Sequence, residues 1–290
     1  MPLIGRFLKQ TTAISYRKNA KKTQGYKEQK NVLHYLLTKA KTTKFGLAHE
    51  FGAILNNDMV SSYQSSVPIM DYDAFYEKWL KYSILGEKDN TWRGRIKYYA
   101  LSSGTTGSPS KRIPVTSEMI RSFQKSSLKQ LSILHSLDLP QSFYSTSILT
   151  VGGSTKLNYK DTHVEGDLSG ILKKHTSFIA TPFTKPGARI SGVKDWSKKL
   201  DLIVEKAPKW DVGIIAGIPS WCIMLMERIV EHYKLNSIHD IWPNLYVYVH
   251  GGVYMEPYRQ RLNAILSRPL DLLDTYLASE GYFGYQEETA

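Results

Sequence analysis

A segment rich in hydroxyl groups and glycine, residues 102–114, is the first candidate for chemistry in this sequence. It reads SSGTTGSPSKRIP and follows the apolar run Ile96–Leu101. Glycine lets successive backbone N–H groups converge on an anion, and hydroxyls add donors for phosphate oxygens. Lys111 and Arg112 can supply positive charge. It is not a Walker A loop, because the position of the second glycine holds Pro109. Composition alone leaves phosphate binding and a flexible surface turn equally open.

A second candidate lies near the end of the sequence, where the apolar run Leu270–Leu277 leads into YLASEGYFG, residues 276–284. A carboxylate beside a hydroxyl at the exit of a strand, here Glu280 beside Ser279, suits Mg²⁺ held against phosphate oxygens. An aromatic ring nearby can cover the face of an adenine. Taken alone, Glu280 has the simpler interpretation of a solvated loop acid.

The elements around these segments alternate between strands and helices. Short apolar runs predict strands at 96–101, 147–151, 211–216, 245–249 and 270–277. Apolar residues at helical spacing predict helices at 71–85, 117–136, 192–206, 219–233 and 255–267. This alternation predicts an α/β fold, with a mostly parallel, doubly wound sheet and flanking helices. In such sheets ligands bind beyond the carboxyl ends of the strands. The search for chemistry therefore concentrates on the strand exits.

Together, the two segments and WPNLYVYVHGG, residues 242–252, carry a resemblance to a known family. The sequence resembles the auxin-responsive acyl acid amido synthetases, in a bacterial-type form, within the acyl-adenylate-forming superfamily. The Ser/Thr/Gly segment is shared across that superfamily, whereas YLASEGYFG points to this family. The resemblance implies the fold of an acyl-adenylate-forming large domain. It also implies a ligase that uses ATP and Mg²⁺ to activate a carboxylic acid and passes the acyl group to an amine, usually an amino acid.

The resemblance also implies roles for individual residues. The hydroxyl-rich segment would grip the phosphates of ATP, with Lys111 acting near the leaving pyrophosphate. Glu280 would hold Mg²⁺, Ser279 would contact phosphate, and Tyr276 would lie against the adenine. The remaining residues implied to bind the nucleotide are Ser102, Ser103, Gly104, Thr105, Thr106 and Gly107 in the first segment, and the backbone of His250, Gly251 and Gly252.

Two other strand exits are less specific. Residues 150–154, TVGGS, either border the acyl pocket or form a simple exit from a strand. Residues 217–221, GIPSW, begin a helix that lines the acyl site by family analogy, with no residue assignable. Ser220 lacks the GxSxG pattern of a hydrolase nucleophile.

Members of this family continue well beyond the matched motifs. Their later part includes an aspartate that binds the ribose hydroxyls and a smaller C-terminal domain with a lysine near the reaction centre. This sequence ends at Ala290. We therefore expect an N-terminal fragment, in which residues 51–290 form an incomplete adenylate-forming large domain and the C-terminal domain is absent.

Positive charge is concentrated at the N-terminus. The 290 residues carry a net charge of +12, and residues 1–50 hold eleven Lys and Arg against Glu28 and Glu50. Apolar residues at helical spacing, Leu3, Phe7 and Ile14 and then Val32 to Ala40, predict two helices there. We expect residues 1–50 to form a basic helical segment packed on the main domain with its lysines in solvent. The alternative is a non-enzymatic truncated product whose basic arm binds anions.

Composition excludes several classes of protein. With 42% hydrophobic and 22% charged residues, the chain is typical of soluble globular proteins. A single cysteine, Cys222, excludes an internal disulfide and a cysteine-based zinc cluster, and its apolar setting favours a buried residue. We expect a cytoplasmic enzyme with small-molecule partners, a carboxylic acid and an amine, and neither nucleic acid nor integral membrane association. Coenzyme A as the acceptor, as in acyl-CoA ligases, is the alternative reaction.

Overall fold

A computed structural model describes residues 9–10, 12–17, 25–102, 110–176 and 181–286. The chain divides into two compact units. One unit contains residues 1–20, 117–157 and 166–290, and the other contains residues 21–116 and 158–165. Each unit is described by itself.

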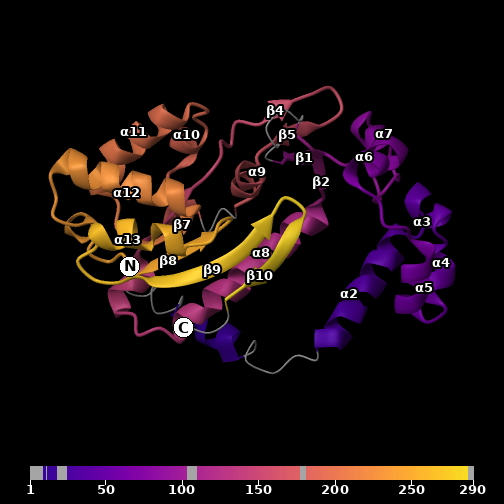
Figure 1. The fold of residues 1–290 in the computed structure, drawn as a ribbon, viewed down its shortest axis with the longest axis horizontal. Coiled ribbons are helices and arrows are strands. Elements are labelled where there is room, and N and C mark those ends of the chain that lie inside the picture. The colour runs from indigo at the N-terminus through magenta and orange to yellow at the C-terminus, as the bar shows by residue number, and fades with distance from the viewer. Residues whose placement is uncertain (1–8, 11, 18–24, 103–109, 177–180, 287–290) are drawn as a thin grey trace. The chain divides into compact units, whose positions relative to one another are not determined.

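The first unit is built on a six-stranded sheet with the order β10-β9-β8-β7-β3-β6 (Figure 1). Neighbouring strands from β6 to β9 run parallel, and β10 pairs antiparallel with β9 at the edge. The predicted mostly parallel sheet is therefore confirmed. The strands are β3 (Ser147–Val151), β6 (Thr184–Lys185), β7 (Val212–Gly217), β8 (Val247–Gly251), β9 (Asp271–Ala278) and β10 (Gly281–Tyr285).

Helices cover both faces of this sheet, as a doubly wound fold requires. On one face α11, α12 and α13 pack over β3, β7 and β8. On the other, two short 3₁₀ helices at 132–135 and 141–145 cover β7, β8 and β9. The α-helices are α8 (Ser117–Leu131), α9 (Leu168–Lys174), α10 (Ala188–Ser191), α11 (Trp196–Lys206), α12 (Pro219–Tyr233) and α13 (Glu256–Ala264), with further 3₁₀ turns at 181–183, 207–209 and 238–240.

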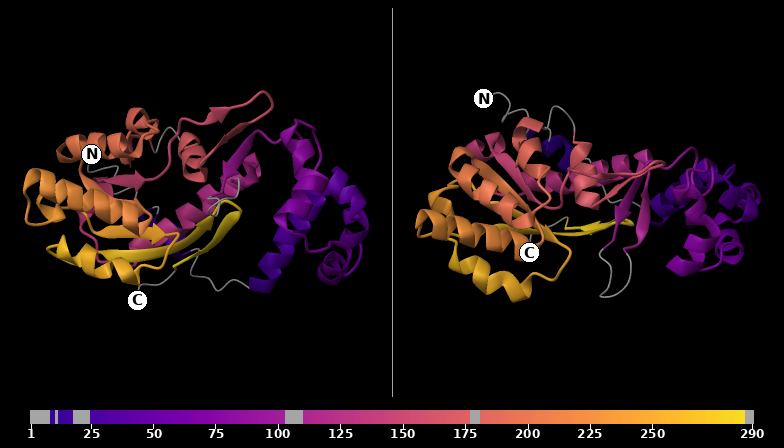
Figure 2. Two further views of the ribbon diagram at one scale, coloured as in Figure 1. Left: turned by 45° about the horizontal axis from the view of Figure 1, so that its top comes forward. Right: turned by 90° about the horizontal axis from the view of Figure 1, so that it is seen from above.

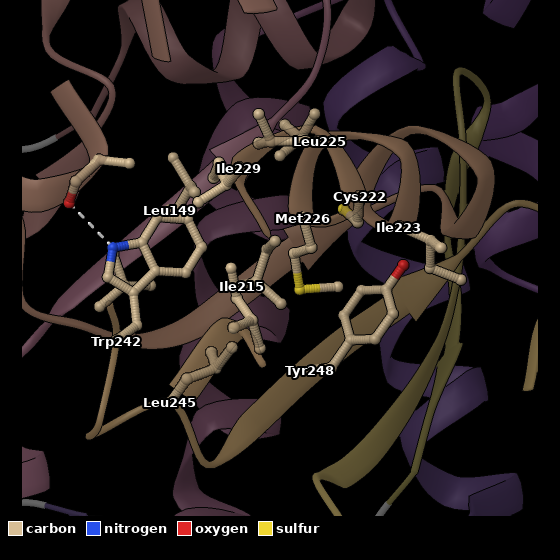
Figure 3. Packing of buried hydrophobic residues seen from close by; sticks show 14 of the residues in the cluster. Leu149, Ile215, Cys222, Ile223, Leu225, Met226, Ile229, Trp242, Leu245 and Tyr248 are labelled. Carbon is tan, nitrogen blue, oxygen red and sulfur yellow. Dashed lines mark hydrogen bonds between the residues drawn. The ribbon is translucent and has the colours of Figure 1, made fainter. Parts of the chain in front are cut away.

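The main core lies between α12 and the sheet (Figure 3). Trp242 is fully buried there, and its indole Nε1 donates to the Ala207 carbonyl at 3.0 Å, so its one polar atom is satisfied. Cys222 is also fully buried, and burial raises the pKa of its thiol to about 12. The interpretation of Cys222 as an apolar core residue is confirmed, because a protonated thiol is a poor nucleophile.

The second unit holds a smaller sheet, with the order β2-β1-β5-β4, and a group of short helices. The predicted strand at 96–101 lies here and not in the parallel sheet, because it pairs antiparallel with the next strand along the chain. The strands are β1 (Tyr98–Leu101), β2 (Arg112–Val115), β4 (Asn158–Tyr159) and β5 (Val164–Gly166). The helices are α2 (Gly25–Ala40), α3 (Lys44–Ala48), α4 (Phe51–Leu55), α5 (Met59–Ser66), α6 (Tyr72–Phe75) and α7 (Lys81–Ile84), the last two joined by a π-helical turn at 76–80.

The second predicted N-terminal helix is confirmed as α2, which buries Leu37 and Ala40 against Phe51 and Ile54. Leu3 and Phe7, from the first predicted helix, lie outside the described residues. The division into residues 1–50 and 51–290 stays a prediction. Among the described residues, no helix combines the length and apolarity needed to cross a membrane.

Candidate nucleotide site

The carboxyl ends of the parallel strands meet at one edge of the large sheet, and most of the described candidate residues lie there. The pairing aligns Val151 of β3 with Gly217 of β7, Gly217 with His250 of β8, and His250 with Asp274 of β9. Beyond this row β9 continues to Ala278 and returns as β10, so the two strands form a long hairpin, drawn in yellow (Figure 2). The residues predicted from two separate motifs are thus neighbours on adjacent strands.

Gly251 and Gly252 bring bare backbone to this edge. Gly251 pairs with Thr275 of β9, and a Cβ atom at Gly251 would collide with the Thr275 carbonyl oxygen. Gly252 has a φ of +82°, a conformation that side chains disfavour. The two glycines therefore leave the end of β8 free of side chains. This is the backbone surface that the resemblance assigns to the nucleotide pocket.

His250 precedes these glycines and is almost completely buried. Burial lowers the pKa of its imidazole and outweighs the opposing effect of the Asp274 carboxylate, whose Oδ1 lies 3.6 Å from Nδ1. The Arg259 guanidinium lowers the pKa further. The side chain is therefore neutral at physiological pH, and Nδ1 has no hydrogen-bond partner among the described residues.

Tyr276 lies on β9 with 65% of its surface exposed. Its ring packs against Phe283 of β10, with centroids 5.1 Å apart and planes inclined by 37°. Phe283 is itself largely exposed. Two rings that hold each other while keeping exposed surface can accept a planar base. The sequence analysis singled out Tyr276 and missed Phe283, although both belong to YLASEGYFG.

Ser279 and Glu280 form the turn between β9 and β10, and the Glu280 side chain is exposed. Among the described residues no three His, Cys, Asp or Glu side chains gather as a metal cage. One accessible carboxylate beside a hydroxyl nevertheless fits Mg²⁺, which is usually held by one or two carboxylates together with substrate phosphates and water. The residues present are therefore compatible with the implied ion.

A hydrogen-bonded group that sequence reasoning missed braces the β9–β10 hairpin. The Tyr282 hydroxyl donates to Oε1 of Gln130 in α8 at 2.6 Å, and the Thr275 hydroxyl donates to Tyr282 at 3.0 Å. Gln130 Nε2 also donates to the Asp274 carbonyl at 3.2 Å. A sequence signal existed, because Gln130 lies at helical spacing from the apolar residues Ile120 and Phe123. All three are buried on the same face of α8. The brace fixes the strand that carries Tyr276.

In the second unit, Ser102 and Lys111 close the base of the β1–β2 loop. The Ser102 N–H donates to the Lys111 carbonyl at 3.0 Å, and the Lys111 N–H donates to the Ser102 hydroxyl at 3.3 Å. The Lys111 ammonium lies 5.1 Å from the centre of the Tyr72 ring. Tyr72 also exchanges hydrogen bonds with the backbone of Arg112. This cation is thus held over an aromatic face at the mouth of the loop.

A buried carboxylate fastens the same hairpin from β5. Glu165 is 5% exposed and accepts a hydrogen bond from Arg112 Nε at 2.9 Å. Lys160 Nζ and His163 Nε2 each lie 3.5 Å from its oxygens. Burial by itself raises the pKa of Glu165, but the hydrogen bond and charge of Arg112, with Lys160, hold it below its usual value. Glu165 is therefore an ionised anchor for the first residue of β2.

The central residues of the hydroxyl-rich segment, Ser103, Gly104, Thr105, Thr106 and Gly107, lie outside the described residues. The flanking Ser102 and Lys111 belong to the second unit, whereas Tyr276, Ser279 and Glu280 belong to the first. The meeting of these two motifs around one nucleotide stays a prediction.

The fold and the strand-end site place the chain in a structural class. Its structure is similar to that of GH3.15 acyl acid amido synthetase, with a TM-score of 0.71, 14% identity and 91% of this chain covered. It is also similar to the structure of AtGH3.15 acyl acid amido synthetase in complex with 2,4-DB, with a TM-score of 0.70, 14% identity and 100% of this chain covered. For a 2-hydroxyisobutyryl-CoA ligase in complex with 2-HIB-AMP and CoA, the TM-score is 0.50, the identity is 11% and 86% of this chain is covered. The fold is thus the α/β fold found in these ligases.

The sequence matches the GH3 family N-terminal domain over residues 17–150 and 134–270, and the chain belongs to the GH3 family. No curated protein matches the sequence. The chain spans 55% and 58% of the lengths of the two amido synthetase structures.

Proposed function

We propose that this chain is the nucleotide-binding part of a ligase that activates a carboxylic acid with ATP and transfers the acyl group to an amine, usually an amino acid. The observation that carries the proposal is the strand-end site. Bare backbone at Gly251 and Gly252, an exposed aromatic pair at Tyr276 and Phe283, and the exposed Glu280 share one edge of a GH3-family sheet. A cytoplasmic location belongs to the same proposal.

The reaction has two steps that balance without a redox partner. A carboxylate oxygen of the acid attacks the α-phosphorus of ATP, the bond to the bridging oxygen breaks, and pyrophosphate leaves. The amine nitrogen then attacks the acyl carbonyl, AMP departs with the electrons of the carbon–oxygen bond, and the nitrogen loses a proton to give the amide. Such transfers depend on positioning and charge neutralisation more than on covalent help from the protein.

The residues divide this work between the ends of the nucleotide. Tyr276 lies against the adenine, with the backbone of Gly251 and Gly252 beside it. Ser279 donates to phosphate, and Glu280 holds Mg²⁺, which supplies positive charge to the phosphate oxygens when bound. Lys111, kept over the Tyr72 ring, neutralises the leaving pyrophosphate. Ser102 and the hydroxyl groups of residues 103–107 complete the grip on the phosphates.

Acid-dependent exchange of labelled pyrophosphate into ATP tests the first step in the protein as the gene encodes it. We expect exchange with at least one member of a carboxylic acid panel, and a fall of about 100-fold for Glu280→Gln. Glu231→Gln makes the same substitution at an exposed acid of α12, and this variant should catalyse the exchange at the wild-type rate. The proposal fails if no acid supports exchange, or if the two variants behave alike.

The alternative acceptor is coenzyme A, and it is retained because the fold is also similar to that of a CoA ligase. The mass of the product formed with an amino acid or with coenzyme A decides between the two. An amide supports the proposed function, whereas a thioester would keep the adenylation step and replace the second.

A further inference from the structure

Two lysines each donate a hydrogen bond to a residue at the carboxyl end of β3, and neither is used in the proposed chemistry. Lys173 of α9 is half-buried, and its ammonium donates to the Thr150 hydroxyl at 2.6 Å and to the Lys185 carbonyl at 3.2 Å. Lys199 of α11 is 3% exposed and donates to the Gly152 carbonyl at 3.1 Å. Helices from two directions thus bring positive charge to one strand end.

This charge is only partly compensated. Among the described residues, the Asp167 carboxylate favours the charged form of Lys199. Burial, together with a smaller effect of the neighbouring Lys199 charge, lowers the pKa of Lys173 to about 8. Neutral hydroxyl and carbonyl partners solvate an ammonium less well than a carboxylate does. The site therefore has a surplus of positive charge that an incoming anion would relieve.

The position of the pair in the sheet is the second observation. From β3 the chain crosses to β6 on one side and then to β7 on the other, so the winding reverses between β3 and β7. In open α/β sheets, the crevice outside the strand ends at this reversal is where ligands bind. Gly152 lies directly beyond β3, and Ile218 directly beyond β7. The lysine pair therefore contacts the end of β3, one of the two strands between which the winding reverses.

The distance from the nucleotide site indicates which part of a ligand reaches the pair. Thr150 of β3 is aligned with Ala216, Val249 and Leu273 on successive strands. Three strand spacings separate β3 from β9, which is about 14 Å. A group bound by Lys173 is thus well away from the adenine at Tyr276.

We propose that Lys173, supported by Lys199, is a subsite that binds a carboxylate of a substrate away from the adenylated carboxyl group. The inference rests on the proposed function for the identity of the ligand. Two substrates can present such a group. One is an acyl acid with a second carboxylate at its far end, and the other is an acceptor amino acid with its α-carboxylate.

Binding of matched small acids, measured by calorimetry without ATP, tests the subsite. Adipate and hexanoate have the same number of carbons and differ by one carboxylate, while glycine and ethylamine make the same comparison for the acceptor. At pH 7 we expect the member with the extra carboxylate to bind about tenfold more tightly in at least one pair. The pair that shows the preference identifies the source of the carboxylate.

Matched variants assign the preference to Lys173. Lys173→Met should abolish it, Lys173→Arg should retain most of it, and Lys198→Met, an exposed lysine in α11, should leave it unchanged. The proposal is overturned if neither pair shows a preference, or if the preference survives in Lys173→Met. If the protein shows the preference but catalyses no pyrophosphate exchange, the subsite is supported and the proposed ligase function is contradicted.

A spectroscopic measurement on the unmodified sequence covers the case in which Lys173→Met does not fold. With ¹³C at the lysine ε-carbons, we expect the Lys173 resonance to titrate near pH 8, and the resonance that is lost in Lys173→Arg identifies it. Saturation with the preferred acid should raise that pKa. A pKa that stays unchanged at saturation contradicts the proposal.

Discussion

The Tyr72 hydroxyl accepts a hydrogen bond from the backbone N–H of Arg112 at 2.8 Å, so α6 is fastened to the first residue of β2. The same ring supports the ammonium of Lys111. One side chain therefore sets both the path of β2 and the place of the cation before it. Tyr72 is therefore a positioning residue for Lys111.

Tyr72→Phe removes the hydroxyl but keeps the ring beneath Lys111. We expect a loss of about 1 kcal/mol in the free energy of unfolding, measured in urea, because the Arg112 N–H loses its acceptor. The control is Tyr76→Phe, since Tyr76 stacks on Tyr72 and its hydroxyl makes no hydrogen bond within the described part of the chain. Equal losses in both variants would show that the hydroxyl does not fasten β2.

Glu165→Gln leaves Arg112 without its buried carboxylate partner. At pH 7 we expect unfolding to become easier by about 1–3 kcal/mol. The pKa of Glu165 is held below its usual value in the folded protein, so its contribution is present above that usual value and is lost as the pH falls through the lowered pKa. The gap between wild type and Glu165→Gln should therefore narrow in acid. A gap independent of pH down to pH 2 would contradict the ionised anchor.

Gly251→Ala places a methyl group against the Thr275 carbonyl, and strands β8 and β9 must separate to admit it. We expect a loss of about 1–3 kcal/mol in stability and weaker binding of ATP, measured by calorimetry. Gly52→Ala is the matched control, because a Cβ at Gly52 meets no neighbour and lies within α4. That variant should be neutral or slightly stabilised. Normal ATP binding by Gly251→Ala would remove β8 from the nucleotide pocket.

Tyr276→Ala removes the exposed ring proposed to cover the adenine. We expect about a fivefold weaker affinity for AMP with little change in stability, because the ring packs chiefly on Phe283 at the surface. Tyr26→Ala removes a similarly exposed ring from α2 and should not affect AMP. If Tyr276→Ala binds AMP as the wild type does, the adenine lies elsewhere.

Lys173 predicts a dependence of stability on alkaline pH. Its pKa is about 8 in the folded protein and near 10.5 when the chain is unfolded, so between these values the unfolded chain holds a proton that the folded chain lacks. The stability of the wild type relative to Lys173→Met should therefore rise from pH 8 to pH 10.5 and be constant below pH 7. Thermal unfolding of both proteins across this range provides the measurement. If the stabilities of the two proteins change with pH in parallel, the Lys173 ammonium is as well solvated in the folded protein as in the unfolded chain.

The regular elements could be predicted because their patterns are local. Helix α12 has the predicted bounds, since Pro219 begins it and an apolar stripe continues to Tyr233. Strand β10 was missed, because Gly281 and Gly284 interrupt GYFGY and its side chains show no burial alternation. The strand at 96–101 was found but placed in the wrong sheet, since an apolar run does not specify its partner.

The candidate site could be predicted only where a motif names it. Gly251 and Tyr276 were found through motifs, and the pairing of β8 with β9 then brings them together. The bracing residues were missed because their partners are remote in sequence. Arg112 lies 40 positions after Tyr72, and Tyr282 lies 152 positions after Gln130. Lys199 did leave a trace, as a cation on the buried stripe of α11 beside Leu200 and Ile203.

The contact between Gly251 and the Thr275 carbonyl limits how this scaffold can diversify. Substitutions at the ends of β8 and β9 must preserve the spacing of two backbones, so few of them are compatible with folding. The ends of β3 and β7 are under the same restriction, because a Cβ atom at Gly217 would collide with the Val151 carbonyl oxygen. A change in the choice of acid should therefore arise from side chains beside these glycines and not from the glycines themselves.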